Sequence, residues 1–289
     1  RDFFPALAAA ALNARDDAPR IEARAIELDL PVDDRAEVNA LGLARRFDDP
    51  AFRNAVVAAL VSRLEAGERV GFPAALGIAD PHGAWSDLQE RLGRPVFEIP
   101  TLPPSVPGMR LFAILRDALR RAGGRLVIGA EAAGVEHDGG RVRAVRARVA
   151  AREERHETAW LVLASGGFAA GGLELDSRWR AHERVLGLPV AGVPEPGAAR
   201  FSPRYFDDHP LARAGVATDA ELRPVDARGE RLFENVLVAG ATLAGAEPWR
   251  EKSGDGISLA TGHRAAGLIL ENVGPARPGG AQAPVTTEA

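Results

Sequence analysis

Two short apolar segments that end in glycine constrain the fold of this 289-residue chain more than any other feature. Residues 160–164 (WLVLA) are followed by Ser-Gly-Gly at 165–167, and residues 236–239 (VLVA) are followed by Gly240. Apolar runs of this length without polar alternation are typical of strands buried on both faces of a parallel sheet. We therefore predict an α/β fold in which both strands end in glycine turns at the carboxyl edge of a sheet, where ligands bind in open α/β folds.

A third glycine turn, Gly254-Asp255-Gly256, opens a helix predicted over residues 257–270. Glycine allows a ligand to approach the backbone closely, and the free N–H groups and dipole of a helix N-terminus favour a negatively charged ligand atom. Each glycine alone is more often ordinary turn chemistry, but three in this order indicate a binding site. The predicted ligand-binding residues at these turns are Ser165, Gly166, Gly240, Ala241, Gly254, Asp255, Gly256 and Ile257.

The segment before residue 160 has α/β character and then a β-meander. The predicted helices are residues 4–12, 38–46, 52–64 and 108–122, and the predicted strands are 23–30, 69–72, 125–128, 134–137 and 141–150, with a charged turn at 151–158 (AREERHET). The run PTLPPSVP at 100–107 holds four prolines in eight residues, so we expect it to be neither helix nor central strand.

Composition excludes several functional classes. The chain has no cysteine, which excludes a disulfide framework, a zinc finger, a thiol nucleophile and a cysteine-ligated iron–sulfur cluster. Its net charge of -4, with Lys252 as its single lysine, argues against nucleic acid as a partner. No apolar run is long enough to span a membrane, and no signal peptide is recognisable, so we expect a cytoplasmic protein.

Hydrolytic and metal chemistry also find little support. The six histidines never occur at i, i+4 spacing, and no serine lies in a GxSxG motif, so we predict no metal site. Residues 240–245 have the GxxxxG spacing of a phosphate-binding loop, but Ala246-Glu247 replaces the required Lys-Ser/Thr. His209 is a candidate base or simply a solvated loop residue, and no catalytic residue is assigned.

The later part of this chain resembles the later half of two-dinucleotide-binding flavoproteins of the succinate dehydrogenase and fumarate reductase type. The resemblance lies in the order of its motifs, which is the meander, LASGG, GVATD-x-x-LRP, VLVAG and the glycine-led helix. More narrowly, three strings resemble the B subunit of anaerobic glycerol-3-phosphate dehydrogenases. They are PTLPPSVPGMRL (100–111), LVLASGGFAAGGL (161–173), and GVATDAELRP (215–224) with the following ENVLVAGATLAG. The resemblance covers roughly residues 20–272.

This resemblance implies a flavoprotein subunit, with FMN as the usual cofactor and FAD as the alternative. Its family oxidises sn-glycerol 3-phosphate to dihydroxyacetone phosphate, as a complex with a catalytic A subunit and an iron–sulfur C subunit that passes electrons to quinone. Such a complex can lie peripherally at the inner face of the cell membrane. The residues expected to contact substrate are Thr101, Ser105, Arg110 and Arg223. The expected domains are an α/β insert or substrate region (1–105), a flavin-domain segment with the meander (106–172), a small cap (173–209), a flavin-domain return segment (210–272) and a disordered tail (273–289).

Two departures from the family pattern leave alternatives open. The GxGxxG turn that cradles the flavin phosphate does not occur in this chain, since Leu259 stands where the third glycine after Gly254 and Gly256 belongs. We therefore expect the first βα turn of the flavin domain to be missing and flavin binding to be poor. The second departure is Asp255, which interrupts the glycine run before the last helix and would repel a flavin phosphate. Alternatively, Asp255 caps the helix or forms a hydrogen bond with a ribityl hydroxyl. The alternatives are a non-catalytic partner subunit, or a fumarate reductase-like or ketosteroid dehydrogenase-like enzyme of another substrate with Arg223 or Tyr205 as donor.

Overall fold

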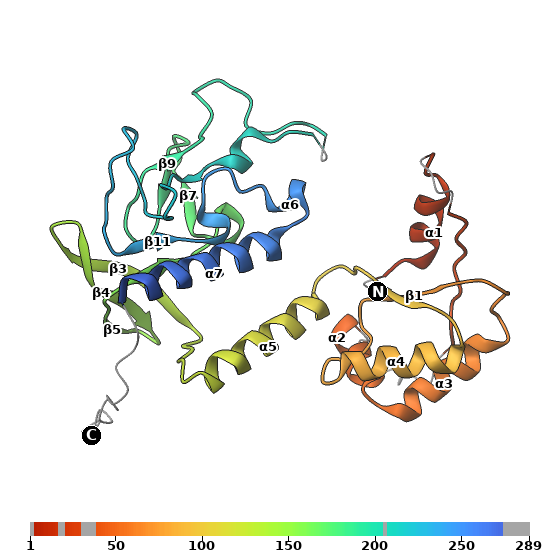
Figure 1. The fold of residues 1–289 in the computed structure, drawn as a ribbon. Coiled ribbons are helices and arrows are strands. Elements are labelled where there is room, and N and C mark those ends of the chain that lie inside the picture. The colour runs from red at the N-terminus through yellow and green to blue at the C-terminus, as the bar shows by residue number, and fades with distance from the viewer. Residues whose placement is uncertain (1–2, 17–20, 30–38, 205–206, 274–289) are drawn as a thin grey trace. The chain divides into compact units, whose positions relative to one another are not determined.

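The computed structural model describes residues 3–16, 21–29, 39–204 and 207–273. The chain divides into two compact units, Arg1–Leu126 and Val127–Ala289, coloured red to yellow and green to blue in Figure 1. The boundary between the two compact units therefore lies between residues 126 and 127. The sequence predicts a domain boundary between residues 105 and 106. Three predicted features lie outside the described residues, in whole or in part: Tyr205, the tail from 274, and the part of the early α/β segment that falls within 30–38.

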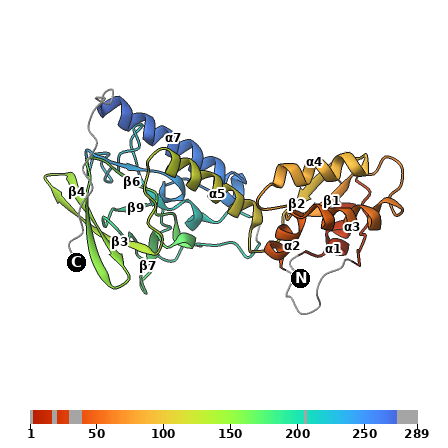
Figure 2. The ribbon, with the colours of Figure 1, turned by 90° about the horizontal axis from the view of Figure 1, so that it is seen from below.

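The first unit is a parallel strand pair with helices around it. Its elements are α1 (Pro5–Asn13), α2 (Ala40–Phe47), α3 (Pro50–Val61), β1 (Val70–Pro73), α4 (Pro81–Leu92), β2 (Val96–Ile99) and α5 (Val106–Arg121). β1 and β2 pair in parallel from Val70↔Val96 to Pro73↔Ile99, and α4 connects them and lies alongside them (Figure 2). Its core consists of the buried residues Phe47, Phe52, Val56, Leu60, Val70, Phe72, Leu76, Leu88, Leu92 and Val96.

Side-chain caps and prolines fix where these helices begin. The Asp80 carboxylate accepts a hydrogen bond from Gly83 N at 2.9 Å before α4, and Ser105 Oγ accepts one from Gly108 N at 3.1 Å before α5. Helix α5 begins at Val106, so the expectation that residues 100–107 contain no helix is wrong at its last two positions. Pro107 is tolerated because the first turn of a helix needs no N–H from it.

One other expectation for the first unit is also wrong. Residues 23–29, within the predicted strand 23–30, are irregular in the structure. No element is predicted where α4 and β2 lie, although Asp80, Pro81 and the left-handed Gly93 (φ +64°) are ordinary start and stop signals for α4. The helices predicted at 4–12, 52–64 and 108–122 and the strand at 69–72 are confirmed to within about three residues at each end.

The second unit combines an antiparallel meander with a second parallel strand pair. Its first elements are β3 (Ala130–Asp138), β4 (Arg141–Val149), β5 (Arg152–Glu157), β6 (Leu161–Leu163), η1 (Phe168–Ala170), β7 (Leu173–Leu175), β8 (Ala181–Glu183) and β9 (Val190–Ala191). They are followed by η2 (Pro210–Arg213), β10 (Gly215–Val216), β11 (Val236–Val238), η3 (Gly240–Thr242), α6 (Pro248–Glu251) and α7 (Gly254–Val273).

The meander is confirmed, and two of its predicted strands are as well: 134–137 lies within β3 and 141–150 matches β4. Its order is β3-β4-β5, and residues 125–128, predicted as its first strand, lie in a loop and turn instead. Its third strand, β5, is formed by residues 152–157, for which the sequence predicts a charged turn. β5 is an exposed strand, so its pairing with β4 and its cross-strand charges, such as Arg146 with Glu153, stabilise it rather than apolar burial.

Asn235 joins the meander to the parallel pair. Its fully buried side chain accepts a hydrogen bond from Val142 N at 2.9 Å and donates to the carbonyl oxygens of Val142 and Ala159, each at 2.8 Å. The core beside it includes Val142, Leu163, Leu173, Leu188, Val216, Val236 and Val238. Strand β6 is less buried than predicted, because Val162 is 37% exposed.

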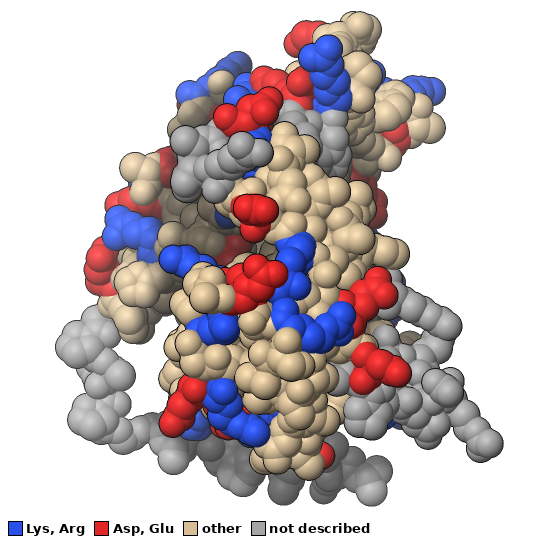
Figure 3. Space-filling view, turned by 90° about the vertical axis from the view of Figure 1, so that its right-hand side faces the viewer, with Lys and Arg blue, Asp and Glu red and all other residues tan. Residues whose placement is uncertain are grey.

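The surface shows no grouping of charge by sign on the face drawn in Figure 3, where Lys and Arg side chains are interspersed with Asp and Glu. Within the described ranges, no helix is both long and apolar enough to cross a membrane.

Candidate functional site

The carboxyl ends of β6 and β11 lie side by side. The two strands pair in parallel from Val236↔Leu161 to Val238↔Leu163, and Ala239 N donates to Leu163 O at 3.0 Å. The predicted turns at 165–167 and 240–242 therefore leave the same edge of the sheet, as the sequence predicts.

A buried threonine holds the two turns together. Thr242 is fully buried, and its Oγ1 accepts a hydrogen bond from Gly166 N at 2.9 Å and donates to Gly166 O at 3.3 Å. A Cβ on Gly167 would lie 3.1 Å from Ala241 O, so the two backbones are in close contact here. No local pattern in the sequence marks Thr242, because its importance depends on a partner 76 positions away.

The third predicted turn reaches the same place through α7. Gly240 N donates to Thr261 Oγ1 at 2.8 Å, and Thr261 Oγ1 donates to Ile257 O at 2.6 Å. Helix α7 begins at Gly254, three residues earlier than predicted, and its first intrahelical bond runs from Ile257 N to Ser253 O at 2.7 Å. The structure thus brings together the three glycine turns that the sequence singles out, which we call the strand-end site (residues 165–167, 240–242 and 254–257).

The strand-end site has groups that suit an anionic, flat ligand such as a flavin phosphate ester. Ser165 Oγ is buried and has no hydrogen-bond partner among the described residues. The N–H groups of residues 254–256 precede the first intrahelical bond of α7, so they remain available as donors. Gly240 has φ +68°, and a Cβ there would meet only Ser258 Oγ at 3.6 Å, so this glycine is required by its conformation.

Two residues of the strand-end site do not support an anionic ligand: packing alone explains Gly166, and the charge of Asp255 opposes an anion. Gly166 has φ +84°, and a Cβ there would lie 2.5 Å from the Cβ of Ala170, so packing alone requires glycine. Asp255 lies in the first turn of α7, where the helix dipole stabilises its carboxylate. Its negative charge would repel a phosphate at the same amides. The residues present therefore fit a flavin through Ser165, Gly240 and the amides of 254–256, whereas the charge of Asp255 opposes a phosphate at those amides.

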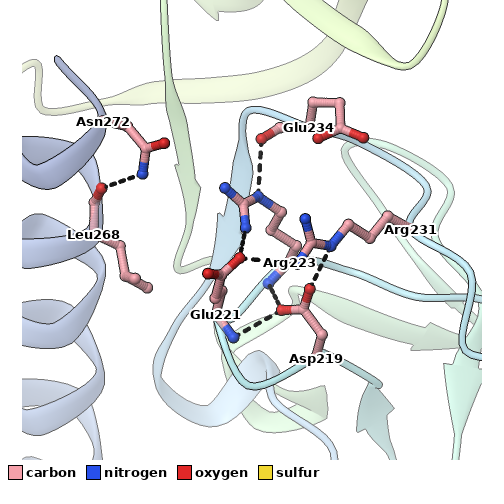
Figure 4. Close-up of polar contacts among 7 residues, drawn as sticks. All are labelled: Asp219, Glu221, Arg223, Arg231, Glu234, Leu268 and Asn272. Carbon is pink, nitrogen blue, oxygen red and sulfur yellow. Dashed lines mark hydrogen bonds and ion pairs between the residues drawn. The ribbon is translucent and has the colours of Figure 1, made fainter.

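Arg223 lies in a charged network on the loop between β10 and β11 (Figure 4). It is only 8% exposed, its Nε donates to Glu234 O at 3.0 Å, and it forms an ion pair with Glu221. Arg231 pairs with Asp219 at 2.6 Å and with Glu221 at 2.8 Å. The guanidinium of Arg223 is therefore held by protein groups, and its contact with substrate stays a prediction.

Asp219 is the carboxylate at the centre of this network. Burial alone would raise its pKa, but hydrogen bonds from the backbone N–H groups of Arg223 and Glu221 and from the Arg231 side chain outweigh burial. The pKa of Asp219 consequently lies below its ordinary value, and the carboxylate stays charged.

Thr101 and Ser105 line a cavity of about 280 Å³ in the first unit, together with Ala74, Glu98, Pro100 and Pro107. Thr101 Oγ1 is buried without a partner among the described residues, whereas Ser105 caps α5. Arg110 donates to Glu98 at 2.7 and 2.9 Å and to Gly77 O at 2.8 Å. The Arg110 guanidinium thus neutralises the Glu98 carboxylate in the cavity wall, and a substrate role for Arg110 stays a prediction.

The remaining candidates are histidine and metal. His209 Nδ1 accepts a hydrogen bond from Ser202 N at 3.1 Å, which orients its ring within the loop before η2. No group of three His, Cys, Asp or Glu side chains in the described part of the chain is arranged to hold a metal ion.

Comparison with known proteins gives consistent results. The family model described as FAD binding domain matches residues 1–257. The B subunit of a probable anaerobic glycerol-3-phosphate dehydrogenase from Halobacterium salinarum is 37% identical over 206 residues, which are 71% of this chain and 48% of that protein. The B subunit of anaerobic glycerol-3-phosphate dehydrogenase from Yersinia pseudotuberculosis is 32% identical over 268 residues, which are 89% of this chain and 60% of that protein.

The protein of the same name from Pectobacterium atrosepticum is 34% identical over 270 residues, 88% of this chain and 60% of that protein. The chain thus spans about half to three fifths of the length of these relatives. Among solved structures, T. acidophilum thioredoxin reductase is 14% identical, with 75% of this chain and 56% of that chain covered. Its TM-score of 0.17 is too low to indicate a shared overall fold.

Proposed function

Because the chain belongs to the FAD binding domain family, we propose that it is the flavin-binding part of an oxidoreductase that converts sn-glycerol 3-phosphate to dihydroxyacetone phosphate. The substrate is taken from the name of the relatives, each of which is the B subunit of an anaerobic glycerol-3-phosphate dehydrogenase. We further propose FMN as the cofactor, with FAD as the alternative. In this proposal a catalytic A subunit and an iron–sulfur C subunit accompany the chain and pass electrons to quinone.

The observation that carries this proposal is the meeting of three glycine turns at one sheet edge, in a chain matched by an FAD binding domain model. Ser165 offers a hydroxyl that no described residue engages, Gly240 a backbone that a ligand can approach, and residues 254–256 three N–H donors. A flavin supplies the acceptor for the two electrons that an alcohol loses on oxidation. The chain's own residues hold the ligand, orient it against the sheet edge, and keep its negative groups near the positive end of α7.

Asp255 favours a second function, that of a non-catalytic subunit which retains the fold. An acidic side chain in the first turn of α7 would repel a phosphate bound at the amides of that turn. If the chain served only to bind the true dehydrogenase, it would tolerate this residue at no cost.

Flavin titration separates the two functions. The purified chain is titrated with FMN and with FAD while quenching of flavin fluorescence is followed, and the same is done for the chain assembled with its partner subunits. Saturable binding, and bleaching of the bound flavin by glycerol 3-phosphate under anaerobic conditions in the assembled complex, are expected. A complex that stays colourless yet assembles would support the non-catalytic function instead.

A further inference from the structure

Helix α5 carries an apolar face that the first unit leaves exposed. Five apolar residues recur at helical spacing along it and form what we call the α5 face: Leu111, Phe112, Leu115, Ala118 and Leu119. Phe112 is 49% exposed, Leu115 47% and Leu119 41%. Of the sixteen residues of α5, all of which the structure describes, only Val106 is buried. Large apolar side chains grouped in this way on a protein surface mark a site of interaction.

The first unit holds α5 by its opposite side. Val106 lies in a buried cluster with Ala40, Ala44 and Ala75. Arg110, four residues later on the same side, donates to Glu98 at 2.7 Å and to Gly77 O at 2.8 Å. Leu115 follows Val106 by nine residues, which at 3.6 residues per turn places it on the far side of the helix. Packing within the first unit therefore anchors α5 and leaves the α5 face uncovered.

The chemistry of the α5 face indicates an apolar occupant. The face itself contains no charged side chain, and Arg116, at its border, lies over the Phe112 ring at 6.0 Å and pairs with Asp117 at 2.9 Å. An amphipathic helix with such a face is the element that covers a parallel sheet, whose two faces both need apolar cover. Among the described strands, each parallel sheet has only two members, β1 with β2 and β6 with β11, fewer than the roughly four to six strands of an ordinary sheet. Further sheet structure is therefore the occupant that this face fits.

The curated relatives contain more chain than their matches to this protein use. The matches to two of them take 89% and 88% of this chain, and each leaves 40% of the relative unmatched, since 60% of its length is covered. The unmatched part of each relative is thus long enough to hold several strands and helices. A segment of that length has the apolar surface that the α5 face lacks.

We propose that the α5 face is an interaction surface for a sheet-forming segment of the complete gene product, outside these 289 residues, that corresponds to the unmatched part of the relatives. The inference stands apart from the proposed function, because it concerns packing and needs neither flavin nor substrate. A second copy of the chain, another subunit and a lipid bilayer are the other occupants that an apolar helix face can have, and the test distinguishes them.

Thiol labelling tests the cover directly. The chain has no cysteine, so Leu115→Cys introduces a single thiol on the α5 face. The rate of its reaction with a maleimide is measured in the 289-residue chain and in the complete gene product, with any cysteine outside these residues replaced by serine. The rate should be at least about 10-fold lower in the complete product. The matched control is Arg120→Cys, an exposed position of α5 away from the face, which should react equally fast in both.

Stability provides a second readout that needs no label. Leu115→Asp places a charge on the α5 face, which is costly only where the face is buried. The urea midpoint of the complete gene product should therefore fall by about 1 M, whereas that of the 289-residue chain should change by less than about 0.3 M. Arg120→Gln should leave both midpoints within about 0.3 M of the wild type. If Leu115→Asp prevents the complete product from folding, Leu115→Ser gives a smaller shift of the same kind.

Four outcomes overturn the inference. The first is a complete gene product no longer than this chain, and the second is equal labelling of Leu115→Cys in both proteins. The third is slow labelling already in the 289-residue chain, which identifies a second copy if it depends on protein concentration and the chain's own second unit if it does not. The fourth is protection that arises only when partner subunits, or vesicles of phosphatidylglycerol and phosphatidylethanolamine, are added, which assigns the α5 face to that partner instead.

Discussion

Both units of the molecule contain a pair of parallel strands, and the two pairs end in chemically different ways. Beyond β1 and β2, the wall of the cavity carries a carboxylate that is already neutralised, because Arg110 donates two hydrogen bonds to Glu98 and Leu76 N donates a third. Beyond β6 and β11, the described chain presents glycine backbone, the unpaired hydroxyl of Ser165 and the amides of α7. The carboxylate at the first strand end is thus satisfied by the protein itself, although Thr101 Oγ1 beside it is unpaired among the described residues, whereas the second strand end presents backbone N–H groups to a ligand.

The largest effect is expected from Gly240→Val, which tests whether the second strand end holds the flavin. Valine at φ +68° is strained and places a branched side chain at the sheet edge, so flavin affinity should fall more than roughly 100-fold, or about 2.8 kcal/mol. Titration with flavin, followed by fluorescence quenching, measures this affinity. The matched control is Gly229→Val, which has φ +83° and open space around its Cβ, and should keep wild-type affinity. Equal losses in both variants would mean that general instability is the cause.

Arg110→Lys tests whether the ion pair of Arg110 with Glu98, beyond β1 and β2, serves the stability of the first unit. Lysine keeps the charge but loses the fork to Glu98, so the free energy of unfolding of the first unit should fall by about 1–2 kcal/mol in urea. Arg120→Lys, at the exposed end of α5, should change it by less than about 0.5 kcal/mol. An unchanged stability together with a raised Michaelis constant would instead place Arg110 in a substrate site.

Thr242→Val tests whether Thr242 holds together the turns that follow β6 and β11. The substitution preserves shape but removes both hydrogen bonds to Gly166 inside the core, so the second unit should lose about 1 kcal/mol of unfolding free energy. Chemical denaturation gives this value, with Thr218→Val as the partly exposed control. A variant as stable as the wild type would show that Thr242 does not hold the turns together.

The smallest effect is expected from acid on the first unit. A hydrogen bond from Arg24, and a second from the backbone N–H of Glu65, lower the pKa of Glu68 to about 2. Because the folded pKa lies below the ordinary value of 4.5, this contribution is complete above about pH 4.5 and is lost as the pH falls toward 2. Glu68→Gln should remove this part of the pH dependence of unfolding. Parallel curves for variant and wild type between about pH 5 and pH 2 would contradict it.

The parts of the fold that sequence analysis recovers are those with a local signal. β11 and α7 are predicted because apolar spacing and glycine mark them, and the meeting of their turns with Gly166 follows from parallel strand order. β5 is missed because its side chains are charged and exposed, so only its partner β4 makes it a strand. Residues 125–128 are wrongly predicted as a strand because apolar composition alone does not require pairing.

The site divides in the same way. Glycines indicate the backbone part of the strand-end site, since their conformation is a local property. Thr242 and Thr261 are not predicted, because a polar side chain becomes important only through burial and through partners far along the chain. Arg110 and Arg223 are candidates for their charge, and the structure shows that each is already paired with a carboxylate.

The contacts of Asn235 have a consequence for synthesis on the ribosome. This side chain bonds Val142, 93 positions earlier, and the next residues pair with β6. The meander can form its hairpins as soon as they emerge, but β6 finds its parallel partner only after residue 238 has left the exit tunnel. Until then the apolar edge of β6 is exposed to solvent and to other nascent chains. Between the translation of β6 and that of β11, this edge therefore lacks the strand that pairs with it in the folded protein.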